Sequence, residues 1–278
     1  MWIASYPKSG NTWFRVLLSN ALQNQASPIN INEIKISNIA SNRTLFDSLT
    51  GVNASDLSTI EIESLRPLVY RKLSKSSDET LYLKVHDAWT LNNKGFPLFP
   101  EDVTKSVIYI IRNPLDVAVS LAYHNSETIE TALNKLNQSS YGLCIGRKRL
   151  SNQLPQKLLS WSEHVLSWVR HSNLMMHVIR YEDMYLNPLN TFSAALEFLE
   201  IPISKNELNK YIAYSNMTEM KKQEELEGFT VKPINAKSFF RKGTVFDWKN
   251  YISEITAKSF LEKNKEVFEM FYDEGIVE

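Results

Sequence analysis

The feature that most constrains the fold is a short polar segment near the start of the chain, Ser5-Tyr6-Pro7-Lys8-Ser9-Gly10-Asn11-Thr12-Trp13. The residues before it, 2–4, are apolar and predict a buried strand, and residues 14–22 carry apolar side chains at helical spacing. A turn from a strand into a helix presents unpaired backbone N–H groups and the positive end of the helix dipole to an anion. Lys8 adds a full positive charge, so the segment predicts a phosphate-binding loop.

This loop differs from the Walker loop that binds nucleoside triphosphates. It lacks the two glycines and the closing Gly-Lys-Ser/Thr of that motif, so an anion other than ATP is favoured. Taken alone, the segment fits a surface loop with a solvated lysine equally well. The rest of the chain has to decide between the two interpretations.

Four short apolar runs, residues 2–6, 81–85, 107–111 and 177–181, are separated by segments with helical patterns. This alternation is typical of an α/β protein, and we expect a single domain over residues 1–278 with a central parallel sheet flanked by helices. Asn187 before Pro188 predicts a helix start, and Ser204 with Glu207 predicts a capping box. The predicted helices are 12–24, 115–124, 156–171, 188–199 and 255–271.

Composition excludes several classes of function. Lys plus Arg and Asp plus Glu both total 31, so no overall charge attracts the chain to nucleic acid or an anionic membrane. Cys144 is the single cysteine, which excludes an intrachain disulfide framework and a thiolate metal cluster, and no apolar run is long enough to span a membrane. Because a strand and the loop are predicted within the first ten residues, we expect no secretory leader. We expect a cytoplasmic protein, monomer or homodimer, that acts on a small molecule.

Three segments, 27–77, 142–154 and 224–237, predict long loops, the first with one or two helices. The second contains Gly146-Arg147-Lys148-Arg149. Long loops in a compact domain are more often lids or binding walls than spacers.

A second candidate anion contact follows the third apolar run. Arg112 comes directly after the predicted strand, and Asn113-Pro114 then starts a helix on which Ser120 lies two turns further on. The carboxyl ends of strands in open α/β sheets form the ligand crevice, so Arg112 and Ser120 are predicted to face an anion there. The alternative is a structural ion pair between Arg112 and Asp116.

A third candidate lies near the end of the chain. Between residues 237 and 249, four basic side chains accompany one acidic side chain, Asp247, although the chain as a whole is balanced. Bound anion explains this local excess, and a solvated loop pinned by aromatic residues is the alternative, although it does not explain why a glycine follows Arg-Lys. The basic residues are Lys237, Arg241, Lys242 and Lys249, and the glycine is Gly243.

These three segments, in this order, resemble the sulfotransferase family that uses 3'-phosphoadenosine 5'-phosphosulfate (PAPS) as donor, from residue 5 to about residue 250. The resemblance implies that the loop binds the 5'-phosphosulfate end and that Arg112, Ser120 and Arg241-Lys242-Gly243 bind the 3'-phosphate. It implies 3'-phosphoadenosine 5'-phosphate (PAP) as the nucleotide product and no metal. The implied loop contacts are Lys8, Ser9, Gly10, Asn11, Thr12 and Trp13.

The resemblance also extends to the predicted second strand, where Lys84 and His86 match the family's Lys-x-His. It implies that His86 is the general base and that Lys84 stabilises the transferring group. A histidine with an unperturbed pKa of ~6.5 suits removal of an acceptor proton at neutral pH. The implied catalytic set is His86, Lys8, Lys84 and Ser120.

Two further matches concern the nucleotide. Arg180-Tyr181-Glu182-Asp183 resembles the family motif whose tyrosine borders the adenine, and residues 215–222 resemble its nucleotide-binding helix start. The resemblance implies that Trp13 and Met217 sandwich the adenine. Tyr181 and Ser215 would hydrogen-bond it, with Asn216 at the helix start.

The chain departs from the family pattern at three places. Phe246 replaces the second glycine of the Arg-Lys-Gly run, which questions the turn but not the phosphate contacts. Asn11 stands where threonine is common, and its backbone N–H can still serve. Residues 249–258 do not reproduce the dimerisation motif common in cytosolic animal members.

The acceptor is less constrained. Similarity to bacterial sulfotransferases that tailor natural products suggests a hydroxyl, amine or guanidine of a product such as a polar alkaloid. Asp87, with Glu127 or Glu130, would favour a cationic acceptor, and Asp87 as a turn cap is the alternative. Trp89, Phe96 and Tyr123, with Pro97 and Phe99, are candidate acceptor walls.

Two other functions stay open at this point. A P-loop kinase-like phosphotransferase would show the same strand, loop and helix, but it needs magnesium and a Walker loop. A non-catalytic nucleotide-binding protein would need the donor site alone, without Lys84 and His86.

Overall fold

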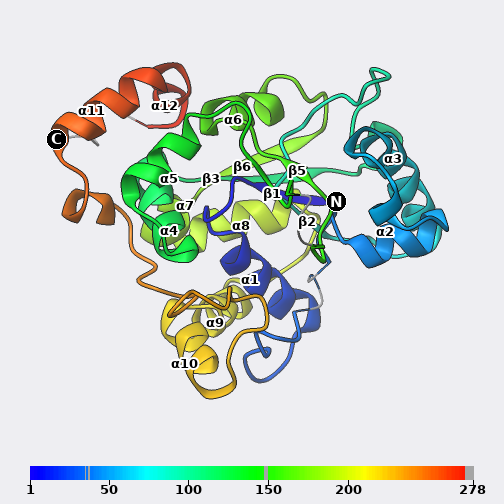
Figure 1. The fold of residues 1–278 in the computed structure, drawn as a ribbon. Coiled ribbons are helices and arrows are strands. Elements are labelled where there is room, and N and C mark those ends of the chain that lie inside the picture. Colours follow the sequence, from blue (N-terminus) through cyan, green and yellow to red (C-terminus); the bar gives the residue numbers. More distant parts are fainter. Residues whose placement is uncertain (35, 37, 147–149, 273–278) are drawn as a thin grey trace. The chain divides into compact units, whose positions relative to one another are not determined.

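The computed structural model describes residues 1–34, 36, 38–146 and 150–272 (Figure 1). It contains a four-stranded parallel sheet flanked by helices, with strand order β2-β1-β3-β6. In the pairing of β1 with β2, Trp2 lies opposite Leu83 and Ala4 opposite Val85. The α/β prediction is therefore confirmed, and each strand falls within its predicted run or one residue from it. The strands are β1 (Trp2–Ser5), β2 (Leu83–Val85), β3 (Val107–Ile111) and β6 (Met176–Arg180).

By its internal contacts the chain divides into two compact units. Unit 1 comprises Met1–Tyr6, Asn38–Tyr109 and Gln138–Met176. Unit 2 comprises Pro7–Ser37, Ile110–Asn137 and His177–Glu278. The predicted donor residues from Lys8 onward all belong to unit 2, whereas Lys84 and His86 belong to unit 1.

Unit 1 is built around a cluster of buried aromatic rings. Trp2 contacts Tyr70 and Phe99 edge to face, with ring centroids 5.0 and 5.1 Å away, and Phe99 also lies 5.1 Å from Trp168. Rings of this size dominate the energy of a core. The other elements of unit 1 are α2 (Arg43–Thr50), η1 (Ala54–Asp56), α3 (Thr59–Lys75), η2 (Glu101–Val103), α6 (Trp161–Val169) and the antiparallel pair β4 (Gly142–Leu143) and β5 (Gln156–Lys157).

Unit 2 is mainly helical, with α1 packed against α9 and α4 against α5. The predicted capping box is confirmed, because Ser204 Oγ accepts from the Glu207 N–H and the Glu207 carboxylate accepts from the Ser204 N–H at the start of α9. The helices are α1 (Asn11–Gln23), α4 (Pro114–Asn125), α5 (Ile129–Leu136), α7 (Tyr181–Leu186), α8 (Pro188–Phe198), α9 (Lys205–Tyr214), α10 (Met217–Glu227), η3 (Asp247–Asn250), α11 (Glu254–Lys263) and α12 (Lys265–Phe271).

Two predicted helices need correction. The helix predicted over 156–171 begins only at Trp161, because Leu159 has a φ of 63° and Ser160 forms a capping box with Glu163. The helix predicted over 255–271 is interrupted at Asn264, whose side-chain amide donates to the Phe260 carbonyl at 2.9 Å. In both cases the spacing of apolar residues predicted a longer helix, and a local turn or cap sets the actual boundary.

The predicted start at Pro188 is confirmed, but Asn187 makes no capping hydrogen bond with its side chain. The 27–77 segment contains α2 and α3, as expected for one or two helices. The 142–154 segment includes β4, and Arg147, Lys148 and Arg149 lie outside the described residues. In the 224–237 segment, α10 continues to Glu227 before the loop begins.

Candidate functional site

The phosphate loop predicted at Lys8 turns through two left-handed residues before α1. Lys8 has a φ of 70° and Gly10 a φ of 99°. A Cβ at residue 10 would lie 2.5 Å from Cδ2 of Tyr181, so both the backbone conformation and the close packing require glycine there. The helix that follows begins at Asn11. Its first N–H groups therefore start at this turn, as the sequence predicted.

Several polar atoms at this loop are buried without a hydrogen-bond partner in the part of the chain that the structure describes. They include the Ser9 hydroxyl, the Trp13 indole N–H and Nε of Arg112. Leaving one such group unbonded costs about 1–3 kcal/mol. Groups of this kind are expected where a polar ligand supplies the missing partners.

Lys8 is surrounded by other charges and by one aromatic ring. Its Nζ lies 4.3 Å from the ring centroid of Phe239 and 3.2 Å from Nδ1 of His124. Burial, together with the positive charges of Arg112 and Arg241, lowers the pKa of Lys8 to about 7, and the Glu224 carboxylate opposes this shift. Ser120, half-buried on α4, lies one helical turn before His124. Sequence reasoning missed His124, and its only signal was this spacing from Ser120.

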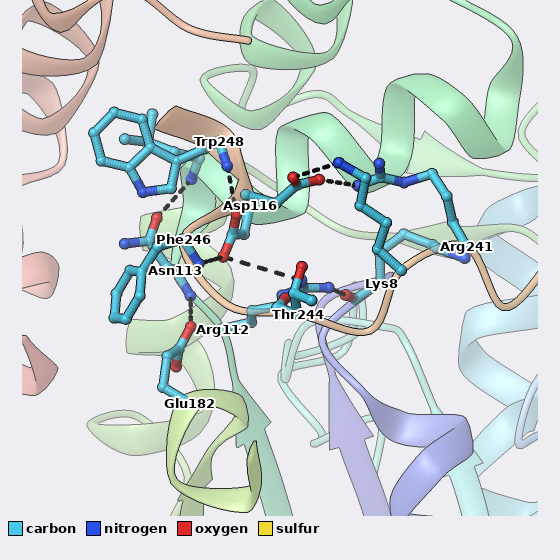
Figure 2. A network of polar contacts seen from close by, with 12 residues as sticks. Lys8, Arg112, Asn113, Asp116, Glu182, Arg241, Thr244, Phe246 and Trp248 are labelled. Atoms are coloured by element: carbon cyan, nitrogen blue, oxygen red, sulfur yellow. Dashed lines mark hydrogen bonds and ion pairs between the residues drawn. The ribbon is translucent and has the colours of Figure 1, made fainter. Parts of the chain in front are cut away.

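Arg112 links the phosphate loop to the basic run near the chain end (Figure 2). Its guanidinium donates to the Lys8 carbonyl at 3.1 Å and to the Thr244 carbonyl at 3.0 Å, and it lies 4.0 Å from the ring centroid of Tyr181. The alternative ion pair with Asp116 is long, at 4.0 Å. Most of the guanidinium's contacts therefore orient it toward the loop rather than neutralise it.

Two carboxylates anchor the segment that carries the basic run. Asp116 accepts from the N–H groups of Phe246 and Trp248 at 2.8 and 2.9 Å (Figure 2). Glu224 of α10 accepts from the N–H groups of Phe239 and Phe240 at 2.6 and 2.9 Å. Burial raises the pKa of Asp116, while Arg112 and the two N–H groups favour its charged form. Both ends of the 239–248 segment are thus held by buried carboxylates.

Within that segment, Arg241 and Lys242 share one acid. Arg241 donates to Asp247 at 2.6 Å, and Lys242 donates to the other carboxylate oxygen of Asp247 at 2.8 Å. Gly243 has a φ of 70°, and a Cβ there would lie 2.1 Å from Cε of Met217. The left-handed backbone therefore favours glycine after Arg-Lys, and the Met217 side chain at the start of α10 would have to shift to admit a Cβ.

Phe246, which replaces a glycine of the family pattern, also adopts a left-handed conformation, with a φ of 59°. The left-handed turn of the family pattern is therefore present at residue 246, although phenylalanine replaces the glycine. Such a conformation costs a residue other than glycine about 1–2 kcal/mol. The hydrogen bond from the Phe246 N–H to Asp116 helps to hold it.

The residues assigned to the adenine have well-defined surroundings in unit 2. The Trp13 ring lies 5.6 Å from the ring of Tyr181 and 5.7 Å from that of Phe192. Ser215 is buried, and its hydroxyl donates to the Tyr211 carbonyl at 2.8 Å. The side chain of Asn216 caps α10 by accepting from the Glu219 N–H.

His86 follows β2 in unit 1, and its ring is oriented by the backbone. Nδ1 lies 2.9 Å from the Ser5 carbonyl, which fixes the Nδ1–H tautomer and leaves the lone pair on Nε2. The buried His164 donates from Nε2 to the His86 carbonyl at 3.1 Å and accepts from the Tyr109 hydroxyl at 2.8 Å. Burial lowers the pKa of His164 to about 4, so it is neutral. Lys84, also half-buried, lies on β2 itself.

The residues predicted to contact the acceptor have different surroundings in the structure. Asp87 is 1% exposed and forms a double hydrogen-bonded ion pair with Arg66, at 2.6 and 2.9 Å. The structure gives it a structural partner, so neither the acceptor contact nor the turn cap describes it. Phe99 belongs to the aromatic core. Phe96 is 61% exposed, and Tyr123 packs under Arg241, with its ring centroid 4.5 Å from the guanidinium carbon.

Metal-ligating clusters and membrane-spanning helices are both absent from the described residues. These residues contain no group of three or more His, Cys, Asp or Glu side chains that could hold a metal ion. Among the same residues, no helix is both long and apolar enough to cross a membrane.

Comparisons with known proteins show which family the chain is similar to. A family model described as "Sulfotransferase domain" matches residues 1–271. "Sulfotransferase 1B1" of Mus musculus is 27% identical over 266 residues, which cover 93% of this chain and 79% of that protein. "Cytosolic sulfotransferase 10" of Arabidopsis thaliana is 25% identical over 257 residues, covering 90% of this chain and 72% of that one.

Solved structures support the same fold. Mouse sulfotransferase SULT7A1 complexed with PAP aligns with a TM-score of 0.61 at 23% identity, over 96% of this chain and 83% of that one. Retinol dehydratase in complex with androsterone and inactive cofactor PAP aligns with a TM-score of 0.62 at 18% identity, over 98% and 81%.

Proposed function

The chain belongs to the sulfotransferase domain family, and on that premise we propose that it transfers a sulfuryl group from PAPS to a small-molecule acceptor. PAP is then the nucleotide product, and the acceptor atom is a hydroxyl oxygen or an amine or guanidine nitrogen. We take residues 1–278 as one sulfotransferase domain. The observation that supports the donor assignment is the set of buried polar groups on Ser9, Trp13 and Arg112 that have no hydrogen-bond partner among the described residues.

These groups fit a nucleotide with two phosphate ends. The Ser9 hydroxyl, the loop N–H groups and Lys8 would hold the 5' end, because they gather at one helix start. Nε of Arg112 and the ammonium and guanidinium groups of the basic run would hold the 3'-phosphate. The proposed adenine contacts are Trp13, Tyr181 and Met217, whereas Ser215 and Asn216 already serve helix ends.

His86 is proposed as the general base. When bound, PAPS supplies a sulfuryl group on a phosphate leaving group. The lone pair on Nε2 of His86 takes the proton of the acceptor, and the bond from Nδ1 to the Ser5 carbonyl favours the imidazolium that forms. Lys8 and Lys84 supply the positive charge that stabilises the charge developing on the phosphate and sulfuryl oxygens.

The acceptor is proposed only as a class. The indole N–H of Trp89 is buried without a partner in the described residues, which supports a contact between Trp89 and a polar atom of the acceptor. The preference for a cationic acceptor loses its basis with the Asp87–Arg66 pair. A natural-product acceptor, a cytoplasmic location and a monomeric or homodimeric state remain predictions.

The test of the donor assignment is thermal unfolding with PAP. A ligand present at 100 times its Kd adds about 2.7 kcal/mol of stability, so PAP should raise Tm clearly, and Arg112→Ala should abolish the rise. Arg71→Ala, which removes an exposed guanidinium paired with Asp102, is the matched control and should keep it. No rise in the wild-type protein would remove the donor assignment.

The same measurement separates the rival functions. A P-loop kinase would be stabilised by ATP with magnesium rather than by PAP. A non-catalytic nucleotide-binding protein would be stabilised by PAP but would turn over no acceptor with PAPS in a broad panel.

A further inference from the structure

One histidine in unit 2 has no role in the reaction described so far. His124 lies in the last turn of α4, and its Nδ1 is 3.2 Å from Nζ of Lys8. Its ring meets Phe239 edge to face, with centroids 5.8 Å apart, and Phe239 in turn lies 4.3 Å from the same Nζ. Lys8, His124 and Phe239 therefore form one contact cluster, the Lys8 cluster.

The chemistry of the two nitrogens restricts their protonation. A hydrogen bond between an amine and an imidazole nitrogen needs one proton between them, so Nδ1 must carry a lone pair when Lys8 is an ammonium. If both groups were fully protonated, two donors would face each other and the contact would become repulsive. The observed geometry therefore fits a neutral His124 that accepts from a charged Lys8.

The ammonium also has donors to spare. It carries three N–H groups, and the bond to His124 uses one of them. The remaining two can bond the oxygens of an anion at the phosphate loop. The bond to His124 fixes the direction of these two N–H groups, because a lysine side chain without such a bond has many rotamers.

We propose that His124 is a positioning residue for Lys8, which accepts one N–H of the ammonium and so holds the charged amine toward the donor phosphate. This inference rests on the proposed function of the loop. It adds a residue that no family pattern in the sequence indicated.

The charged groups around Lys8 make the role of His124 depend on pH. Arg112 and Arg241 disfavour the ammonium, whereas Glu224 of α10 favours it. Burial lowers the pKa of Lys8 to about 7, so the ammonium needs support at neutral pH and above. An accepted hydrogen bond stabilises the charged form, and its loss lowers the pKa of Lys8 further.

The experiment is calorimetric measurement of the Kd for PAP at pH 6 and pH 8.5. His124→Phe keeps an aromatic ring beside Phe239 but removes the acceptor. We expect it to weaken PAP binding about tenfold at pH 8.5, because the ammonium loses the hydrogen bond that stabilises it, and to change it little at pH 6, where Lys8 is charged without that bond. His124→Gln restores an acceptor and should recover most of the affinity.

His177→Gln is the control. His177 also belongs to unit 2 and stacks on Phe198, with ring centroids 5.3 Å apart, and its replacement should leave the Kd unchanged at both pH values. If His124→Phe does not fold, His124→Ala takes its place. Each variant is first checked for a cooperative thermal transition.

Three results would overturn the inference. They are an unchanged Kd in His124→Phe at both pH values, a His124→Gln variant as weak as His124→Phe, and tighter binding in His124→Phe. The last would mean that His124 competes with the donor for Lys8. Failure of the wild-type protein to bind PAP at either pH would instead remove the proposed function, so the two failures are distinguishable.

Discussion

At and beside the phosphate loop of unit 2, buried polar atoms of Ser9, Trp13 and Arg112 have no partner in the described part of the chain, whereas the groups that hold His86 in unit 1 are bonded to one another. Tyr109 bonds His164 and His164 bonds the His86 carbonyl. A region that has to bind a large anion needs donors that are not already used. A region that moves a single proton gains more from internal bonds that fix one ring in one tautomer.

Left-handed residues other than glycine occur in both units, Leu159 in unit 1 among them, and in unit 2 two of them lie in the loop and the basic run. Lys8 and Phe246, both in unit 2, hold left-handed conformations with φ of 70° and 59°. Gly10 and Gly243 are left-handed as well, and a Cβ at residue 10 would also clash with the Tyr181 ring. Strain of this kind collects at binding sites, where the surrounding contacts maintain it.

The largest predicted effect is a loss of folding stability caused by a substitution in unit 1. Asp87→Ala leaves the guanidinium of Arg66 buried without its carboxylate, and removing one partner of a buried pair costs about 3–5 kcal/mol. Urea unfolding should show this loss, whereas Asp102→Ala in the exposed pair with Arg71 should cost ~1 kcal/mol or less. A small loss in Asp87→Ala together with a changed acceptor KM would return Asp87 to the acceptor site.

In unit 2 the corresponding change should affect binding rather than folding. Arg112→Lys keeps a positive charge but loses Nε and the planar fork, so we expect the Kd for PAP to rise about 10- to 100-fold. Arg180→Lys, in the half-exposed pair with Asp183, is the control and should leave the Kd unchanged. Equal PAP affinity in Arg112→Lys and the wild-type protein would show that Arg112 acts only as a structural residue.

The pH dependence of PAP binding sharpens the comparison further. Burial lowers the pKa of Lys8 from 10.5 to about 7, so its ammonium is lost as the pH rises through that value. Since the bound phosphate requires the ammonium, the Kd for PAP should rise above pH 7 and approach a tenfold increase per pH unit. Lys8→Arg stays charged and should flatten the profile. A flat profile in the wild-type protein would contradict the lowered pKa.

The smallest predicted effect concerns Phe246. Phe246→Gly and Phe246→Ala both remove the ring, but only glycine adopts a φ of 59° without strain. The glycine variant should therefore be more stable than the alanine variant by about 1 kcal/mol in urea unfolding. If the alanine variant is the more stable of the two, as is usual at positions with negative φ, the backbone at residue 246 must have left the left-handed conformation.

Local patterns predicted the strands and most helix starts, because apolar periodicity and capping residues act over a few positions. They also indicated the turn at Lys8, Arg112 and the basic run, which contact one another in the structure, whereas phosphate binding by them stays a prediction. Helix ends were less predictable. The apolar spacing continues across Leu159 and Asn264, but the helices do not. Leu159 is left-handed, and the Asn264 side chain bonds the Phe260 carbonyl.

Contacts between distant segments could not be predicted. Arg66 lies 21 residues from Asp87, and His124 lies 116 residues from Lys8, so neither pairing leaves a local signature. The roles of the Asp116 and Glu224 carboxylates could not be predicted either. They accept from backbone N–H groups, and every residue except proline has such a group.

The most direct test of the central claim is transfer of label from PAPS carrying a radioactive sulfuryl group, measured across an acceptor panel for the wild-type protein and His86→Ala. We predict that the wild-type protein labels at least one hydroxyl or amine acceptor. His86→Ala should bind PAP as tightly as the wild-type protein but transfer label about 10²–10⁴ times more slowly. Equal transfer rates in the two proteins would contradict the assignment of His86 as the base, and a wild-type protein that binds PAP yet labels no acceptor would contradict the assignment as a sulfotransferase.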